Sequence, residues 1–352
     1  MGVARILFIS DTHLGFDYPF RPRIQRRRRG PDFFANFNRA LEPAIRGEVD
    51  CVIHGGDILY RSKVPAGLVD MAFEPLRRVA DNKVPVFVVP GNHERSAIPY
   101  RLLAQYPHIH IFDQPQTFSL NTGDITIAIS GFPYERTNVR GRFPGLVRQT
   151  GGLDTKADCR LLCVHHCVEG ATVGPGNYTF RYNDDVIRVA DIPGEFAAVL
   201  SGHIHRHQIL TKDLNGNPLD VTVFYPGSVE RTSFAEKDEA KGYLILEIGT
   251  NGSDKGHIVN WVFHELPARP MVQLVIRGEN MTGKALAEHI EETLLAQSKD
   301  SVVKIRIHGK LGDDALETVR ADSIRKLSPQ TMNVQVNLAD YRARKKDGLF
   351  KA

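Results

Sequence analysis

The sequence lacks the run of about eighteen apolar residues that a membrane-spanning helix requires. It also lacks a secretory signal pattern, because residues 1–5 lead directly into a short apolar run. N-myristoylation of Gly2 is disfavoured, since Ile6 stands where that motif needs Ser or Thr. We therefore expect a cytoplasmic protein with no membrane partner.

Cysteine is scarce, with 4 residues among 352, and without a secretory pattern we expect free thiols in a reducing compartment. Cys159, Cys163 and Cys167 recur at every fourth position, which raises the alternative of a metal cluster. They contain no C-x2-C pair of the zinc type, and Cys163 lies inside an apolar run. We favour burial as small apolar side chains.

The composition is that of an ordinary globular protein, with 42% apolar and 24% charged residues. A chain of 352 residues favours one large domain with a smaller one attached. The net charge of +4 and the isoelectric point near 8.8 permit a nucleic-acid partner without requiring one.

Apolar runs alternate with amphipathic segments in the first part of the chain. The runs at 6–9, 50–54 and 84–89 are predicted strands. The segments at about 31–47 and 65–79 are predicted helices. This alternation predicts a layered α/β domain with right-handed crossovers.

The chain then becomes rich in predicted strands. Turn residues at 121–124 and 215–217 predict two hairpins. The predicted strands cover residues 117–120, 125–130, 161–164, 197–200, 208–212, 221–225, 242–248 and 258–264.

A break bracketed by prolines at 267–270 marks a domain boundary. We expect a large domain over residues 1–266, a small α/β domain over 271–340 and a basic tail over 341–352. The small domain is predicted to contain strands at 271–276, 301–308 and 332–338, and helices at about 282–297 and 313–326.

Five junctions at the ends of predicted strands carry metal-binding residue types. The carboxyl ends of such strands share one edge, so these side chains should lie together. Each alone has an ordinary explanation, and His54 is expected to be structural. Burying so many polar groups at one edge is costly unless a group such as a dinuclear metal centre satisfies them. The residues are Asp11 with His13, Asp57, Asn92 with His93, His165, and His203 with His205.

The order of these motifs, D-x-H, G-D, G-N-H-E, H and G-H-x-H, resembles that of the calcineurin-like metallophosphoesterases. The resemblance implies a four-layer α/β/β/α sandwich with a small C-terminal α/β domain. It also implies two divalent metal ions bridged by Asp57. One ion would be held by Asp11, His13, Asp57 and His205, and the other by Asp57, Asn92, His165 and His203.

His93 follows a ligand without being expected to bind metal, so it is free to stabilise or protonate the leaving oxygen. Two metal ions activate water and stabilise the attacking and leaving oxygens, as phosphodiester hydrolysis requires. Carboxylate, amide and imidazole ligands suit Mn²⁺, Fe²⁺ or Zn²⁺. The resemblance favours Mn²⁺. His166 is an alternative ligand to His165 at the fourth junction.

Further motifs bear on the substrate. The segments Asp11–Gly15, Tyr225–Phe234 and Lys241–Tyr243 resemble the SbcD-type (meiotic recombination eleven) nucleases of DNA double-strand-break repair. That resemblance implies a Mn²⁺-dependent 3′–5′ exonuclease on duplex ends that is also an endonuclease on single strands. It implies a homodimer, joined through helices at about 65–79 and 96–105, which works with an SbcC-type coiled-coil ATPase. The small C-terminal domain is similar to the family's DNA-capping domain.

Tyr60 departs from this family, in which a His three residues after the bridging Asp positions the scissile phosphate. Tyr60 donates a hydrogen bond but carries no positive charge, so we expect weakened exonuclease activity unless Arg61 or His166 compensates. A loop of arginines after the first strand is expected to contact DNA phosphates, with a solvated loop as the alternative. Its central residues are Arg26, Arg27, Arg28 and Arg29.

Two other functions stay open. The Asp-Arg-Gly sequence of the superfamily's protein phosphatases is absent after Asp57, but a non-DNA phosphodiesterase or phosphatase would use the same metal ligands. A scaffold that binds DNA ends with weak catalysis is the second alternative, favoured by Tyr60 and the capping-like domain.

Overall fold

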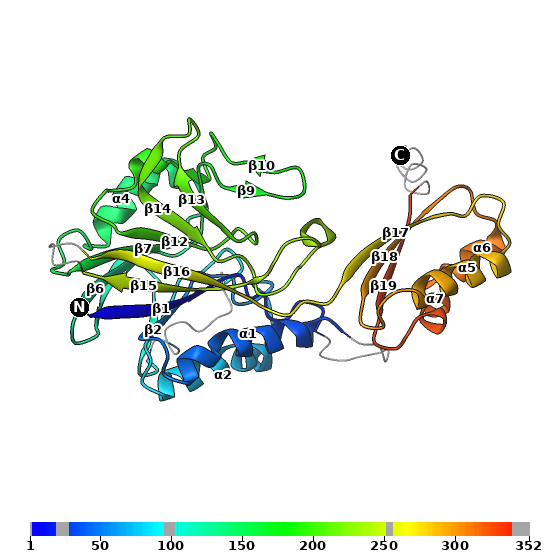
Figure 1. Ribbon diagram of the computed structural model, residues 1–352, viewed down its shortest axis with the longest axis horizontal. Helices are drawn as coiled ribbons and strands as arrows, with labels where there is room; N and C mark the ends of the chain where they lie inside the picture. Colours follow the sequence, from blue (N-terminus) through cyan, green and yellow to red (C-terminus); the bar gives the residue numbers. More distant parts are fainter. Residues whose placement is uncertain (1, 19–27, 95–102, 104, 251–255, 340–352) are drawn as a thin grey trace, which may run out of the picture. The chain divides into compact units, whose positions relative to one another are not determined.

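The computed structural model describes residues 2–18, 28–94, 103, 105–250 and 256–339 (Figure 1). The chain forms two compact units. The large unit contains residues 1–17 and 30–267, and the small unit contains residues 18–29 and 268–352. Among the described residues, no helix is both long enough and apolar enough to cross a membrane.

The first sheet of the large unit has six strands in the order β16-β15-β1-β2-β3-β4. The strands β1 to β4 are parallel, β15 pairs antiparallel with β1, and β16 pairs antiparallel with β15 at the edge. The predicted strand at 84–89 is shortened, because Pro85 and Pro90 flank its paired core and lack an N–H. The bounds are β1 Val3–Ile9, β2 Cys51–His54, β3 Val86–Val88, β4 Ile109–Ile111, β15 Gly242–Gly249 and β16 His257–Glu265.

The second sheet also has six strands, in the order β13-β14-β12-β7-β6-β5. Its four central strands are parallel, and each edge strand closes one of the two predicted hairpins. The bounds are β5 Gln116–Asn121, β6 Thr126–Gly131, β7 Cys159–Val164, β12 Ala198–Ser201, β13 Gln208–Lys212 and β14 Pro218–Tyr225. Short pairs join β8 Cys167–Val168 to β11 Val186–Ile187 and β9 Thr172–Val173 to β10 Tyr178–Thr179.

The two sheets pack face to face with helices outside, which confirms the predicted four-layer sandwich (Figure 1). Side chains alternate along β1, so Phe8 packs between the sheets and Leu7 packs under the helices. Burial on both faces explains why this strand is a continuous apolar run. The helices α1 (Gly30–Ile45) and α2 (Ala66–Asp81) cover the first sheet, and α4 (Val139–Gln149) covers the second.

The four cysteines are free and buried, as expected. Cys51, Cys159 and Cys163 pack in the core between the sheets, and Cys167 packs in the core beneath α4. Burial raises the pKa of the Cys159 thiol to about 12, which keeps it protonated at neutral pH. These side chains serve as core residues.

The small unit is a three-stranded parallel sheet with helices on one face (Figure 1). The prediction of one helix over 313–326 is wrong: Arg320 takes an extended backbone conformation and separates two short helices. The helix expected at 96–105 lies almost entirely outside the described residues. The bounds are β17 Met271–Arg277, α5 Gly283–Leu295, β18 Val302–His308, α6 Asp313–Thr318, α7 Ala321–Leu327 and β19 Asn333–Leu338.

Candidate metal centre

The predicted metal ligands converge from the ends of strands in both sheets. Backbone hydrogen bonds continue the β1–β2 pairing into the loops, with Asp11 N–H donating to Gly56 O at 2.9 Å and His13 N–H donating to Asp57 O at 3.0 Å. His203 N–H donates to Asp11 Oδ2 at 3.0 Å and so joins the β12 loop to the β1 loop. The site therefore spans the carboxyl edges of both sheets.

Four of the converging residues have left-handed backbone conformations. The φ angles are 51° at Asp11, 43° at His13, 52° at Asp57 and 79° at His203. Such angles are uncommon outside glycine, although Asp and His tolerate them better than most residues. Clusters of strained backbone persist where surrounding structure enforces them, as at binding and active sites.

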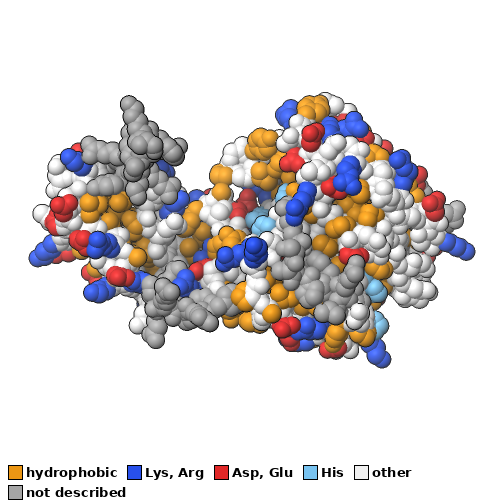
Figure 2. Space-filling model, turned by 180° about the vertical axis from the view of Figure 1, so that it is seen from behind, with side chains coloured by type: hydrophobic (Ala, Val, Ile, Leu, Met, Phe, Trp, Pro, Cys, Tyr) orange, Lys and Arg blue, Asp and Glu red, His pale blue; other side chains and the backbone are white. Residues whose placement is uncertain are grey.

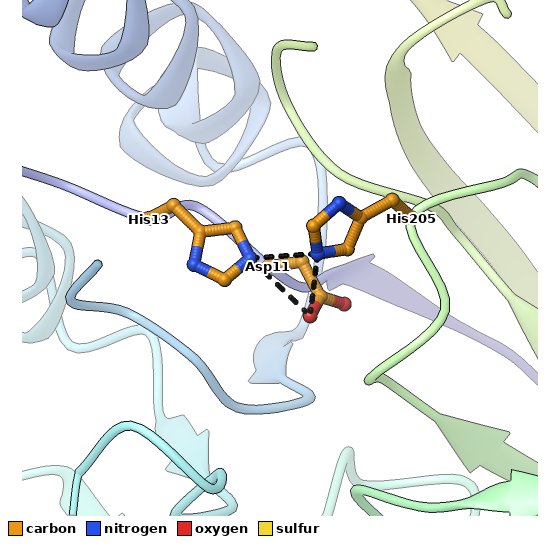
Figure 3. A group of neighbouring side chains, drawn as sticks. All are labelled: Asp11, His13 and His205. Carbon is orange, nitrogen blue, oxygen red and sulfur yellow. Dashed lines mark hydrogen bonds and ion pairs between the residues drawn. The ribbon is translucent and has the colours of Figure 1, made fainter. Parts of the chain in front are cut away.

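The first group of ligands contains Asp11, His13 and His205 (Figure 3). The two Nε2 atoms of His13 and His205 point toward each other and lie 2.8 Å apart. Asp11 Oδ1 lies 3.8 Å from His13 Nε2 and 4.0 Å from His205 Nε2. Oδ1 is buried and has no hydrogen-bond partner in the described part of the chain. A cation among these three atoms would satisfy that oxygen and both imidazoles.

The second group surrounds the amide of Asn92. Asn92 Oδ1 lies 3.1 Å from His165 Nε2 and 2.9 Å from His203 Nδ1. His165 is fully buried, and its Nδ1 lies 2.7 Å from the backbone oxygen of Gly55. Because Gly55 O is an acceptor, the ring proton belongs on Nδ1, and the unprotonated Nε2 faces the site. Amide oxygen and imidazole nitrogen are both suitable ligands for a first-row divalent cation.

Asp57 lies between the two groups. Its Oδ2 is 3.5 Å from His165 Nε2, and the residue also belongs to a cluster with His13 and His93. Burial alone raises the pKa of Asp57, but the charge and hydrogen bond of His165 outweigh it and bring the pKa below its usual range. An ionised carboxylate in this place suits the bridging position between two cations.

The other ionisable groups of the site show the electrostatic cost of burial. Burial raises the pKa of Asp11, and the charges of His165 and His205 offset this rise only in part. Burial also lowers the pKa of His203 to about 3, which keeps its imidazole neutral as a ligand must be. For His165, the same burial effect is outweighed by Asp57 and Asp11, which raise its pKa to about 9.

Three residues without an assigned role shape the loops. Glu94 is buried, and its carboxylate accepts backbone N–H groups from Asp57 at 2.9 Å, Leu59 at 2.9 Å and Gly91 at 2.8 Å. A Cβ at Gly91 would overlap the Asp57 carboxylate, and one at Gly56 would overlap the His165 ring. The sequence could have indicated these three residues, because all of them lie within the G-D and G-N-H-E motifs.

His54 and His166 are held away from the ligand positions. His54 is buried, with Nδ1 accepting the Gly56 N–H at 3.1 Å and Nε2 lying 3.2 Å from Thr12 Oγ1. His166 is 1% exposed and its Nε2 accepts the Glu135 N–H at 3.0 Å. The Tyr134 ring stacks on His166 with centroids 4.7 Å apart, a contact that no sequence pattern indicated.

The residues expected to contact DNA differ in their exposure to solvent. Tyr60 and Arg61 are exposed, and the Tyr60 ring stands 6.2 Å from the His93 ring between centroids. Arg26 and Arg27 lie outside the described residues. Arg28 is half-buried, and Arg29 is buried at 8% exposure. In the space-filling view, histidine and acidic side chains meet at the surface with Lys and Arg side chains beside them (Figure 2).

Comparison with known proteins gives consistent matches. The family model described as calcineurin-like phosphoesterase matches residues 4–207. Three similar proteins are described as DNA double-strand break repair protein Mre11. The one from Halobacterium salinarum is 30% identical over 332 residues, which is 89% of this chain and 75% of that protein. The one from Thermoplasma acidophilum is 22% identical over 356 residues, which is 96% of this chain and 87% of that protein. For Saccharolobus solfataricus the values are 26% over 216 residues, 60% of this chain and about half, 52%, of that protein.

Proposed function

Because this chain belongs to the calcineurin-like phosphoesterase family, with distant homology to archaeal Mre11 proteins, we propose that it is a two-metal DNA nuclease of double-strand-break repair. The observation that carries the proposal is the position of Asp57 between two groups of ligands. A metal-dependent phosphodiesterase needs such a pair of adjacent cation positions.

The donor set fits two divalent cations. Asp11, His13, Asp57 and His205 would hold one cation, and Asp57, Asn92, His165 and His203 would hold the other. When bound, such cations would supply a nucleophile from water at neutral pH and stabilise charge on the attacking and leaving oxygens. We propose Mn²⁺, with Fe²⁺ and Zn²⁺ as the alternatives that these ligands also suit.

His93 is proposed to act at the leaving oxygen. Its backbone N–H donates to Asp57 Oδ1 at 2.9 Å, which fixes the loop, while the side chain is 31% exposed and reaches solvent. A partly exposed imidazole at the edge of the ligand groups can approach a substrate and donate a proton to the departing oxygen. His93 also lies within reach of a cation position shared with His13 and Asp57, so metal binding by His93 is the competing role.

DNA as the substrate is supported by the homology and by the surface of the small unit. The face of its sheet opposite the helices carries Arg277 and Arg306, both exposed, and none of the residues in its three strands is acidic. Such a face attracts a phosphate backbone irrespective of sequence. We propose that the predicted small domain over residues 271–340 is a DNA-capping domain, followed by the basic tail over 341–352.

The proposed mode of action follows the distant homologues. We propose 3′–5′ exonuclease activity on duplex ends and endonuclease activity on single strands, in a homodimer with α2 at its contact. A coiled-coil ATPase of the SbcC type is the proposed partner. The four free, buried cysteines are compatible with the proposed cytoplasmic location.

The decisive experiment incubates the purified protein with end-labelled duplex DNA and circular single-stranded DNA in Mn²⁺, Mg²⁺ or Zn²⁺. We expect Mn²⁺-dependent shortening of the duplex and opening of the circle, both absent in Asp57→Ala. Turnover of small aryl phosphodiesters without cleavage of DNA would instead identify a non-DNA phosphodiesterase. Tight DNA binding with no cleavage in any metal would identify a DNA-end scaffold.

A further inference from the structure

The segment that joins β14 to β15 has no role in the proposed chemistry, yet it lies against one of the histidine ligands. Glu236 in this segment is 9% exposed, and its Oε1 lies 3.3 Å from His205 Nδ1. The Nε2 of the same ring faces His13 Nε2 at 2.8 Å, on the cation side. Glu236 thus contacts the far nitrogen of a ligand imidazole.

The Glu236 carboxylate is fixed by its own segment. Oε1 accepts the Thr232 hydroxyl at 2.7 Å and the Ser233 hydroxyl at 3.2 Å. Oε2 accepts the Thr232 backbone N–H at 3.3 Å and pairs with Lys241 Nζ at 2.9 Å. A carboxylate with this many partners has little freedom to turn away from His205.

Lys241 is fully buried and holds His205 from a second direction. Its Nζ donates to the His205 backbone carbonyl at 2.7 Å and to Glu239 Oε2 at 2.9 Å, in addition to its pair with Glu236. These are three acceptors for the three protons of an ammonium group. Lys241 therefore binds the backbone of His205 directly and its ring through Glu236.

The imidazoles of His165 and His13 are held differently. His165 Nδ1 faces a backbone carbonyl, and His13 Nδ1 has no hydrogen-bond partner among the described residues. A carboxylate on the far nitrogen fixes the tautomer of a ligand imidazole and makes it a stronger donor to a cation. Of His13, His165 and His205, the three whose far nitrogen the structure describes, His205 is the one that has this contact.

We propose that Glu236 and Lys241 are positioning residues that set the affinity of the Asp11–His13–His205 position for its cation, independently of the other position. The inference rests on the proposed two-metal site. It also gives a physical role to the Tyr225–Phe234 and Lys241–Tyr243 motifs, because Thr232, Ser233 and Lys241 in them hold the Glu236 carboxylate beside His205.

The test is Mn²⁺ binding by the full-length protein, measured by isothermal titration calorimetry and by equilibrium dialysis. Wild type is expected to bind two Mn²⁺ ions. In the isosteric Glu236→Gln the affinity of one position should fall about tenfold and in Glu236→Ala about a hundredfold, while the other position keeps its affinity. Glu169→Gln is the matched control, because the side chains of Glu169 and Glu236 are each 11% exposed and Glu169 pairs with Arg140, which is not a proposed ligand.

Circular dichroism of the metal-free variants checks that each is folded, and the Gln variant keeps the test valid where the Ala variant fails to fold. Two unchanged affinities in Glu236→Gln would overturn the inference. So would an equal loss at both positions, which indicates a general structural role. A wild-type protein that binds no Mn²⁺ would overturn the proposed function, and the inference with it.

Discussion

His93 Nδ1 lies 3.8 Å from Asp57 Oδ2, while the His93 backbone N–H donates to Oδ1 of the same carboxylate at 2.9 Å. The backbone contact holds the loop against the proposed bridging ligand, and the ring remains partly exposed beside it. The position of the backbone is therefore set independently of the imidazole, and a substitution at His93 can separate chemistry from metal binding.

Replacing His93 with Ala is expected to lower kcat for a phosphodiester by about 10²- to 10⁴-fold, the usual contribution of a positioned proton donor. Mn²⁺ stoichiometry should stay at the wild-type value, because the Asp57 contact uses the backbone. Steady-state kinetics on bis(p-nitrophenyl) phosphate and calorimetric Mn²⁺ titration measure the two quantities. If the variant instead loses one Mn²⁺ ion, His93 is a ligand, as its cluster with His13 and Asp57 also permits.

The affinity for Mn²⁺ should rise with pH. Without a cation, burial lowers the pKa of His165, but Asp57 and Asp11 outweigh it and raise the pKa to about 9. A cation binds only the neutral imidazole, so below that pH it must displace a proton. Apparent affinity is then expected to increase about tenfold per pH unit between pH 6 and 8 for each proton displaced.

Calorimetric titrations at several pH values, each in two buffers of different ionisation enthalpy, measure both the affinity and the protons released. We expect release of at least one proton per protein at pH 7. An affinity that does not change from pH 6 to 8, with no proton released, would show that His165 is already neutral.

Much of the sandwich could be predicted because its strands are buried on both faces and therefore read as short apolar runs. The ligands could be predicted because each follows such a run, and parallel strands share an edge. The contact of Glu236 with His205 could not, since 31 residues separate them and only the path of the loop brings them together. Likewise, nothing in the sequence of 313–326 indicates the break at Arg320, where the backbone alone changes conformation.

His166 illustrates a further limit of sequence reasoning. Two adjacent histidines directly follow β7, and continued strand alternation predicts that they point to opposite sides. The structure directs His165 to the ligands and turns His166 toward the Glu135 N–H, where it is buried. Which side is occupied by metal ligands depends on the packing of the second sheet, which a single strand does not reveal.

Tyr60→His is expected to increase exonuclease activity on duplex ends. Tyr60 is 36% exposed and its ring lies 6.1 Å from that of His13, so a residue there faces a substrate at the ligand groups. A hydrogen bond from a charged donor contributes about 1.5–3 kcal/mol, against about 0.5–1.5 kcal/mol from a neutral hydroxyl. Replacing the hydroxyl with an imidazolium should therefore gain about 1.4 kcal/mol and raise the rate about tenfold. End-labelled duplex degradation in Mn²⁺ measures this rate.

Tyr60→Phe is the matched variant, since it removes only the hydroxyl. It should leave the Mn²⁺ stoichiometry at the wild-type value, as should Tyr60→His, because neither alters a metal ligand. Equal exonuclease rates for the Tyr, His and Phe proteins would show that this position does not contact the scissile phosphate.

Arg277→Ala combined with Arg306→Ala should weaken DNA binding and reduce its dependence on salt. Both arginines are exposed on the sheet face opposite the small unit's helices. Each lost phosphate contact should lower the slope of log K against log salt by about one. Fluorescence anisotropy with labelled duplex DNA at several salt concentrations gives the slope.

The matched control is Lys284→Ala combined with Arg320→Ala, which removes the same charge from the helical side of the small unit, where both side chains are exposed. If net charge alone governed binding, the two double variants would lose the same affinity and the same salt dependence. A greater loss for Arg277 and Arg306 would locate the contact on the sheet face, because only contacting cations release counterions from the DNA. Hydrolysis of a small phosphodiester should be unchanged in both, since neither pair approaches the metal ligands in sequence or belongs to the unit that carries them.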